Sequence, residues 1–348
     1  MRTDKPVCVT GGSGFIASHI VGELLERGYS VRGTVRSLRQ PGKYSFLTQL
    51  PGAADRLQLV EADLLTPGSY DAAVTGCDVV MHTASPYFID VKDPQRDLVD
   101  PAVNGTLNVL ASAKKAGVRR VILTSSMSAI SDEPIEGKVF TEADWNDQST
   151  LTRNPYYYSK TVAERAAWTF MKEQSPPFDL VVINPFMVLG PSLGPELNTT
   201  NAIFRDILSG VYPGVMNLTW GLVDVRDVAK AHVLAMETEQ AHGRYLTAGD
   251  ALNMQQIVAI LREAGYDKGY KLPRLDLTSR FGDVLGRLLS YTQKAGTGSY
   301  LRTHLGKVMR YDTSKVRRDL GLTFRPARDS VLATVESLVQ WGHLKPAS

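Results

Sequence analysis

The chain has 348 residues, of which 43% are hydrophobic and 22% charged, an ordinary globular composition that allows a sizeable core without disulfide or metal crosslinks. Its formal net charge of only +3 argues against nucleic acid as the main ligand but suits an anionic cofactor. Two cysteines, Cys8 and Cys77, make no disulfide framework, and no apolar run approaches the roughly 18 residues that span a bilayer. A strand expected almost at the N-terminus leaves no room for a signal peptide, so we expect a soluble, cytoplasmic protein.

The first half of the chain alternates short β-branched runs with amphipathic helical stretches. The runs of strand length are residues 7–10, 29–35, 57–61, 78–82, 120–124 and 180–184. The first is followed by a glycine turn and a helix that reaches Arg27, with Gly28 as its C-terminal stop. Strands that alternate with helices predict a Rossmann-type, doubly wound α/β fold, in which a parallel sheet carries helices on both faces.

The pattern changes after Pro185. Residues 185–200 are rich in proline and glycine and are predicted as a loop, whereas helical segments return at 224–237, 253–264 and 330–341. We predict an NADP-binding lobe of residues 1–184, to which 222–250 return, and a smaller substrate-binding lobe of residues 185–221 and 251–348. Because ligands of such folds bind at the carboxyl ends of the strands, the second lobe is expected to cover that edge.

The segment VTGGSGFIASHI, residues 9–20, is typical of a dinucleotide-binding turn, since it follows an expected strand and opens an expected helix. Gly11 makes the tight turn, Gly14 lets the backbone approach a pyrophosphate, and Ala17 allows close packing of helix on strand. Phe15 and Ile16, which follow Gly14, are also expected to bind the cofactor. The pyrophosphate is expected at the helix N-terminus, where unpaired N–H groups and the helix dipole favour negative charge.

The end of the second strand indicates NADPH rather than NADH. An NAD enzyme usually places Asp or Glu there, whereas residues 29–43 contain no acidic residue and place Arg36 at the strand end, with Lys43 beyond it. An arginine can bind a 2′-phosphate through two hydrogen bonds and stack on adenine. Weaker candidates for cofactor contacts follow the third and fourth strands: Asp63, Leu64, Ala84 and Ser85.

Reduction of a carbonyl group requires a proton donor for the developing alkoxide. A free tyrosine has a pKa of about 10, and a lysine one helical turn away supplies the cation that lowers it. Tyr156 and Lys160 have this spacing at the start of an expected helix, and Ser126 follows the strand 120–124, where its hydroxyl can orient a carbonyl. The same spacing recurs at Tyr311 and Lys315, where nothing else supports catalysis.

These motifs resemble the extended short-chain dehydrogenase/reductase family, in its branch of dihydroflavonol, cinnamoyl-CoA and aldehyde reductases. The matching stretches are VTGGSGFIASHIVGELLERGYSVRGTVR, HTASP, NGTLNVL, VILTSS, YYYSKTVAERAAW and LVDVRDVAKAH, in the family's order. The resemblance implies a triad of Ser126, Tyr156 and Lys160, with Lys160 also bonding the nicotinamide ribose and Pro185 and Val188 lining the nicotinamide pocket. It also implies five substrate-facing residues: Tyr87, Phe88, Met127, Phe186 and Met187.

The sequence therefore predicts NADPH-dependent reduction of an aldehyde or ketone with apolar or aromatic bulk, by a monomer or homodimer that uses no metal, nucleic acid or membrane. A nucleotide-sugar epimerase or dehydratase is the alternative on the same fold. Against it stand the absence of an acidic residue near Arg36 and the presence of Met127 and Ser128 where such dehydratases carry carboxylates. A steroid dehydrogenase and a non-catalytic NADP-sensing regulator stay open, although such regulators commonly lose the tyrosine–lysine pair.

Overall fold

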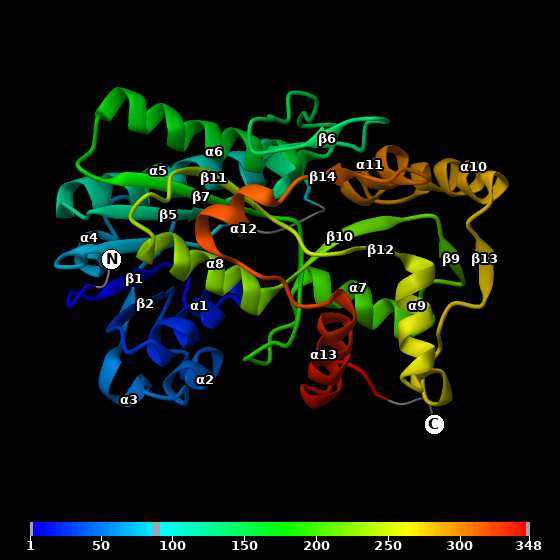
Figure 1. The fold of residues 1–348 in the computed structure, drawn as a ribbon, viewed down its shortest axis with the longest axis horizontal. Coiled ribbons are helices and arrows are strands. Elements are labelled where there is room, and N and C mark those ends of the chain that lie inside the picture. The colour runs from blue at the N-terminus through cyan, green and yellow to red at the C-terminus, as the bar shows by residue number, and fades with distance from the viewer. Residues whose placement is uncertain (1–2, 86–90, 346–348) are drawn as a thin grey trace.

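The computed structural model describes residues 3–85 and 91–345 and is built around a seven-stranded parallel sheet (Figure 1). Its strand order is β11-β7-β5-β4-β1-β2-β3. The strands are β1 (Val7–Val9), β2 (Val31–Val35), β3 (Leu57–Glu61), β4 (Val79–His82), β5 (Arg120–Thr124), β7 (Asp179–Pro185) and β11 (Gly243–Thr247). The chain runs outward from β1 to β3 on one side and from β4 to β11 on the other. The predicted doubly wound fold is therefore confirmed, with its switch point between β1 and β4.

Helices cover both faces of this sheet, because successive side chains of a strand point to opposite sides. Val7 and Val9 pack in one apolar cluster, whereas Cys8 between them packs in the cluster on the opposite face. The first cluster includes α1 (Phe15–Glu26), α8 (Val225–Glu237) and α12 (Ser314–Leu320). The second includes α4 (Asp71–Val74), α5 (Asp100–Ala116) and α6 (Pro155–Gln174), so Figure 1 shows the sheet between two helical layers.

The remaining elements form smaller sheets with their own helices beside the main sheet (Figure 1). One has the order β12-β10-β8, with β8 (Met187–Leu189), β10 (Thr219–Asp224) and β12 (Ala251–Asn253). Two-stranded sheets pair β9 (Gly214–Met216) with β13 (Leu275–Leu277) and β6 (Val139–Phe140) with β14 (Arg310–Tyr311). The helices are α7 (Thr199–Leu208), α9 (Met254–Glu263), α10 (Arg280–Leu289), α11 (Ala295–His304) and α13 (Ala327–Gln340). Shorter helical turns are η1 (Pro41–Lys43), α2 (Ser45–Thr48), α3 (Ala53–Arg56), η2 (Gln95–Val99), η3 (Met127–Ala129), η4 (Tyr266–Lys268) and η5 (Ser290–Thr292).

The prediction of a loop over residues 185–200 is wrong at two places. β8 pairs in parallel with β10, and α7 already begins at Thr199, capped by the Asn198 side chain, which accepts from the N–H of Asn201 at 2.9 Å. A strand of three residues is too short to show a period, and the prolines and glycines around it suggest a turn. Within 222–250, β11 joins the main sheet, whereas β10 belongs to the three-stranded sheet. The lobe boundaries remain a prediction.

The carboxyl ends of the central strands open into one large cavity, of about 1290 Å³, whose other wall comes from the smaller sheets and their helices. Ligands of open parallel sheets bind at this edge. In the part of the chain that the structure describes, no helix is long and apolar enough to cross a membrane.

Candidate active site

The turn between β1 and α1 forms one end of the cavity. Gly11 has a φ of +64°, which favours glycine, and a Cβ added there would lie 3.2 Å from the Cβ of Ala84. Thr10 joins the two loops, because its Oγ1 accepts from the N–H groups of Thr83 and Ala84, each at 3.0 Å. The loops after β1 and β4 are therefore held in contact through small residues.

The N-terminus of α1 faces this cavity without a side-chain cap from any described residue, and its first turn carries no acidic side chain. Gly14 is its N-cap, in an extended conformation, and lies on the cavity wall with Gly11, Phe15 and Ile16. The first N–H groups of a helix have no partner within the helix and carry partial positive charge. The turn therefore fits a phosphate-bearing cofactor, as the sequence predicts.

The predicted adenine and 2′-phosphate contacts divide into two groups. Arg36, exposed at the end of β2, lines the cavity, as do Asp63 and Leu64 after β3. Lys43 lies exposed in the turn η1, outside the set of described residues that line the cavity. Its role remains a prediction, and its position on a separate turn explains why strand order alone could not place it.

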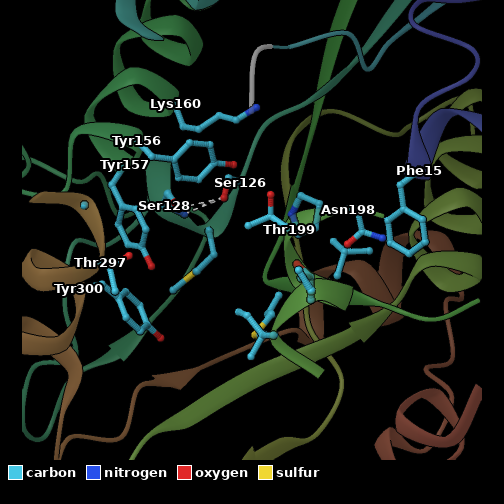
Figure 2. A pocket seen from close by; sticks show the side chains of 18 of the residues that line it. Phe15, Ser126, Ser128, Tyr156, Tyr157, Lys160, Asn198, Thr199, Thr297 and Tyr300 are labelled. Carbon is cyan, nitrogen blue, oxygen red and sulfur yellow. Dashed lines mark hydrogen bonds between the residues drawn. The ribbon is translucent and has the colours of Figure 1, made fainter. Parts of the chain in front are cut away.

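The three triad candidates lie on one wall of the cavity, with Lys160, Tyr156 and Ser126 pointing into it (Figure 2). The Nζ of Lys160 lies 6.0 Å from the ring centroid of Tyr156 and donates to the Oγ of Ser85 at 3.0 Å. The Oγ of Ser126 accepts from the N–H of Ser128 at 3.1 Å. The three residues that the sequence spacing singled out therefore lie together in the structure.

Burial changes the proton affinity of Lys160. Loss of hydration lowers the pKa of its ammonium group from 10.5 to about 8, and the negative charge of Glu164 opposes this change. Because the pKa lies above 7, the protonated form still dominates at neutral pH. A cation therefore stands beside Tyr156.

The start of α6 is fixed by an unusual residue, Asn154. It precedes Pro155 and has a φ of +48°, in the left-handed region that asparagine tolerates better than most residues. Its Nδ2 donates to Asp132 Oδ1 at 2.8 Å, and its backbone N–H donates to Ser299 Oγ at 3.1 Å. These bonds position the first turn of α6 and with it Tyr156.

A buried ionic network behind the triad was not anticipated from the sequence. Glu164 accepts from Ser125 Oγ at 2.6 Å, from Asn184 Nδ2 at 2.8 Å and from Arg244 Nε at 2.6 Å. Asn184 Nδ2 also donates to the carbonyl oxygen of Ser126 at 3.1 Å. Glu164 has a detectable signal, since it stands one helical turn after Lys160, but Arg244 comes 80 residues later and no local pattern connects the two.

Predicted substrate-side residues lie where the cavity continues past the triad. Met127, Phe186 and Met187 line it, whereas Tyr87 and Phe88 lie outside the described residues. Pro185 and Val188, predicted for the nicotinamide pocket, also line the cavity. Sequence reasoning missed most of the opposite wall, which comes from α7, β9, β10, α10 and α11. Figure 2 shows Tyr157, Thr297 and Tyr300 together on one side of the cavity and Phe15 with Asn198 on the other.

The second tyrosine–lysine pair lies apart from this site. Tyr311 donates to the carbonyl oxygen of Gly249 at 3.0 Å, and the Nζ of Lys315 lies 3.3 Å from the ring centroid of Tyr245. Neither Tyr311 nor Lys315 is among the described residues that line the cavity. Both side chains have structural partners instead.

Comparison with known proteins gives consistent matches over the whole chain. The model of the NAD dependent epimerase/dehydratase family matches residues 7–249. A cinnamoyl-CoA reductase of Medicago truncatula, CAD2, is 42% identical over 344 residues, covering 95% of each chain. Tetraketide alpha-pyrone reductase 1 of Arabidopsis thaliana is 36% identical, covering 97% of this chain and 96% of its own.

Among solved structures, the yeast methylglyoxal/isovaleraldehyde reductase Gre2, complexed with NADPH, superposes with a TM-score of 0.79 at 31% identity. The match covers 97% of this chain and 99% of the yeast chain. The similarity therefore includes the cavity and both of its walls.

Proposed function

Because the chain belongs to the NAD dependent epimerase/dehydratase family, in the reductase branch of the extended short-chain dehydrogenases/reductases, we propose that it reduces an aldehyde or ketone to the alcohol with NADPH. One observation carries the proposal: the glycine-rich turn that leads into α1 lines the same cavity as the side chains of Ser126, Tyr156 and Lys160. The predicted oxidoreductase class and family branch are confirmed by the similar reductases.

NADP(H) is the cofactor, since the yeast structure at 31% identity holds NADPH and since Arg36 stands at the cavity end of β2. Gly11 and Gly14 would receive the pyrophosphate at the start of α1, and Arg36 the 2′-phosphate. Asp63 and Leu64 would contact the adenine, and Ala84 and Ser85 the ribose and nicotinamide. When bound, the cofactor supplies the hydride that adds to the carbonyl carbon.

The residues of the chain supply the proton and orient the substrate. The hydroxyl of Tyr156 donates its proton to the carbonyl oxygen as the alcohol forms, and the hydroxyl of Ser126 donates a hydrogen bond to the same oxygen. The ammonium group of Lys160 stabilises the tyrosinate that remains. Hydride and proton together convert the carbonyl group to CH–OH without a further reactant.

The test is oxidation of NADPH, followed by its absorbance, with methylglyoxal, isovaleraldehyde, aromatic aldehydes and a steroid ketone. Tyr156→Phe should lower kcat by about 10²- to 10⁴-fold and leave the Kd of NADPH nearly unchanged. Tyr158→Phe is the matched control, because Tyr158 is on the same helix but outside the described cavity lining. Undiminished turnover in the Tyr156 variant would refute the assignment of the proton donor. NADPH binding without turnover of any carbonyl compound would favour the sensing regulator.

A second candidate is reduction of a CoA thioester, favoured by the 42% identity to a cinnamoyl-CoA reductase. In that reaction hydride adds to the thioester carbonyl, and the thiolate leaves to give an aldehyde. Incubation with cinnamoyl-CoA and NADPH distinguishes the two, because release of free thiol accompanies NADPH oxidation only for a thioester.

A further inference from the structure

Past the triad, the cavity continues into a region with apolar walls. Ile203 and Ile207 of α7, Met216 of β9, Trp220 of β10 and Leu301 of α11 line it. Several of these, including Ile203, Met216 and Leu301, are only partly buried although they pack against an apolar cluster. The cavity of about 1290 Å³ also exceeds the roughly 300–1,000 Å³ that a single drug-sized ligand fills. The part of the cavity beyond the triad therefore offers apolar walls to a bound substrate.

The helix α10 turns one face toward the cavity. Gly282, Leu285, Gly286 and Leu289 share this face at helical spacing, and all four line the cavity. A Cβ added at Gly286 would lie 2.7 Å from Leu305 Cδ2, and Arg287 Nη2 donates to the carbonyl oxygen of Leu305 at 2.9 Å. Close contact with the rest of the protein is therefore made at Gly286 and Arg287, and the two leucines are left at the border of the cavity.

Two leucines of α10 lie where the apolar region meets solvent. Leu285 and Leu289 line the cavity and are nevertheless 38% and 53% exposed. Val211, in the turn between α7 and β9, also lines it and is 61% exposed. Apolar side chains shared between a cavity and the surface are typical of ligand-binding grooves. The opening of the apolar region to solvent, its mouth, is therefore lined by apolar side chains.

We propose that the substrate carries an extended hydrocarbon chain on its carbonyl group, and that this chain lies along α7 and β9 and leaves the protein between Val211 and Leu289. The inference rests on the proposed function, because it extends from the same triad. The carbonyl group lies at Tyr156, and each methylene beyond it removes further apolar surface from water. The substrate class is therefore a long-chain aldehyde or ketone.

The experiment measures kcat/KM with NADPH for straight-chain aldehydes from butanal to dodecanal. Each added methylene should raise kcat/KM by about threefold to fourfold until the chain reaches the mouth. The double variant Leu285→Gln/Leu289→Gln should lower kcat/KM for dodecanal about tenfold and change that for butanal less than about twofold. Leu288→Gln is the matched control, since Leu288 lies on the same helix at 63% exposure but outside the described cavity lining.

A binding measurement keeps this inference distinct from the reaction. Calorimetric titration of the NADPH-loaded protein with decanol and butanol should show tighter binding of decanol, weakened by the changes at Leu285 and Leu289. That result would support the chain site even in a protein that turned over no aldehyde. Normal turnover with a kcat/KM independent of chain length would overturn the chain site and keep the reaction. The chain site would also be overturned if Leu288→Gln lowered kcat/KM for dodecanal as much as the double variant and abolished binding to phospholipid vesicles. That outcome would assign α10 to a lipid surface.

Discussion

Replacement of Glu164 by glutamine is expected to lower the stability of the protein by about 3 kcal/mol and to shift the pH range in which it works. The Glu164 carboxylate is buried, and its ion pair with Arg244 has an Nε–Oε1 distance of 2.6 Å. Removal of its charge leaves the guanidinium group of Arg244, only 7% exposed, without a counterion. The perturbation therefore tests a buried charge pair one helical turn from Lys160.

The magnitude follows from what Arg244 retains. Breaking a buried ion pair on one side typically costs about 3–5 kcal/mol, because the other charge remains buried. Arg244 also donates to the carbonyl oxygens of Glu142 and Asp144 at 3.0 and 2.5 Å, and its guanidinium lies 4.0 Å from the ring centroid of Trp145. These partners place the expected loss at the lower end of the range. A second change, Arg244→Met, should recover at least half of it, since the unpaired charge is then gone.

The effect on pH dependence works through Lys160. Its pKa of about 8 is held up by the charge of Glu164 against the effect of burial. Below this pKa the ammonium group is present, and above it the cation is lost, so activity should fall as pH rises through about 8. With glutamine at 164 the pKa of Lys160 falls further, and the alkaline decline of kcat/KM should move to lower pH.

Urea unfolding followed by circular dichroism and a pH profile of kcat/KM are the two assays. Glu173→Gln, an exposed change on the same helix, is the control for the loss of one carboxylate. Unfolding of the Glu164 variant at the wild-type urea concentration would refute the stability argument. An unchanged alkaline decline would show that Glu164 does not act through Lys160.

Three further predictions follow from individual residues. Arg36→Ala should raise the Kd of NADPH at least about tenfold while barely changing that of NADH, as measured by fluorescence titration; equal losses for both would contradict the 2′-phosphate contact. Gly11→Ala should cost about 1–3 kcal/mol in urea unfolding because φ is +64° there, and no loss would contradict the strain argument. Four buried histidines have pKa values lowered to about 3 or 4: His19, His82, His232 and His304. As the pH decreases, these histidines therefore take up protons in the unfolded chain before they do so in the folded protein. The free energy of unfolding should fall as pH decreases from about 6.5 toward 4, by about 1.4 kcal/mol per pH unit for each histidine. His232→Gln should reduce that slope by one proton, and an unchanged slope would contradict it.

The sequence predicts those parts of the fold that depend on long or strongly punctuated patterns. Residues 57–61 and 120–124 form β3 and β5 with the expected bounds, and Gly28 follows α1 with a φ of +83°. The glycine turn and the spacing from Tyr156 to Lys160 are equally local. By contrast, β8 and the pair of Glu164 with Arg244 depend on partners that lie far along the chain. The apolar half of the cavity was not predicted either, because its walls come from α7, β9, β10, α10 and α11, which no local pattern brings together.

The two copies of the tyrosine–lysine spacing show why such a motif needs its helix. Pro155 opens α6 one residue before Tyr156, so Tyr156 and Lys160 are both helical and share a face. Tyr311 belongs to the strand β14, and α12 begins only at Ser314, so Lys315 is not one helical turn from that tyrosine. An acidic residue follows each lysine at four residues, Glu164 in one copy and Asp319 in the other, and does not distinguish them. The start of the helix distinguishes the two copies. Pro155 begins α6 directly before Tyr156, so the ammonium group of Lys160 and the hydroxyl of Tyr156 face the same cavity.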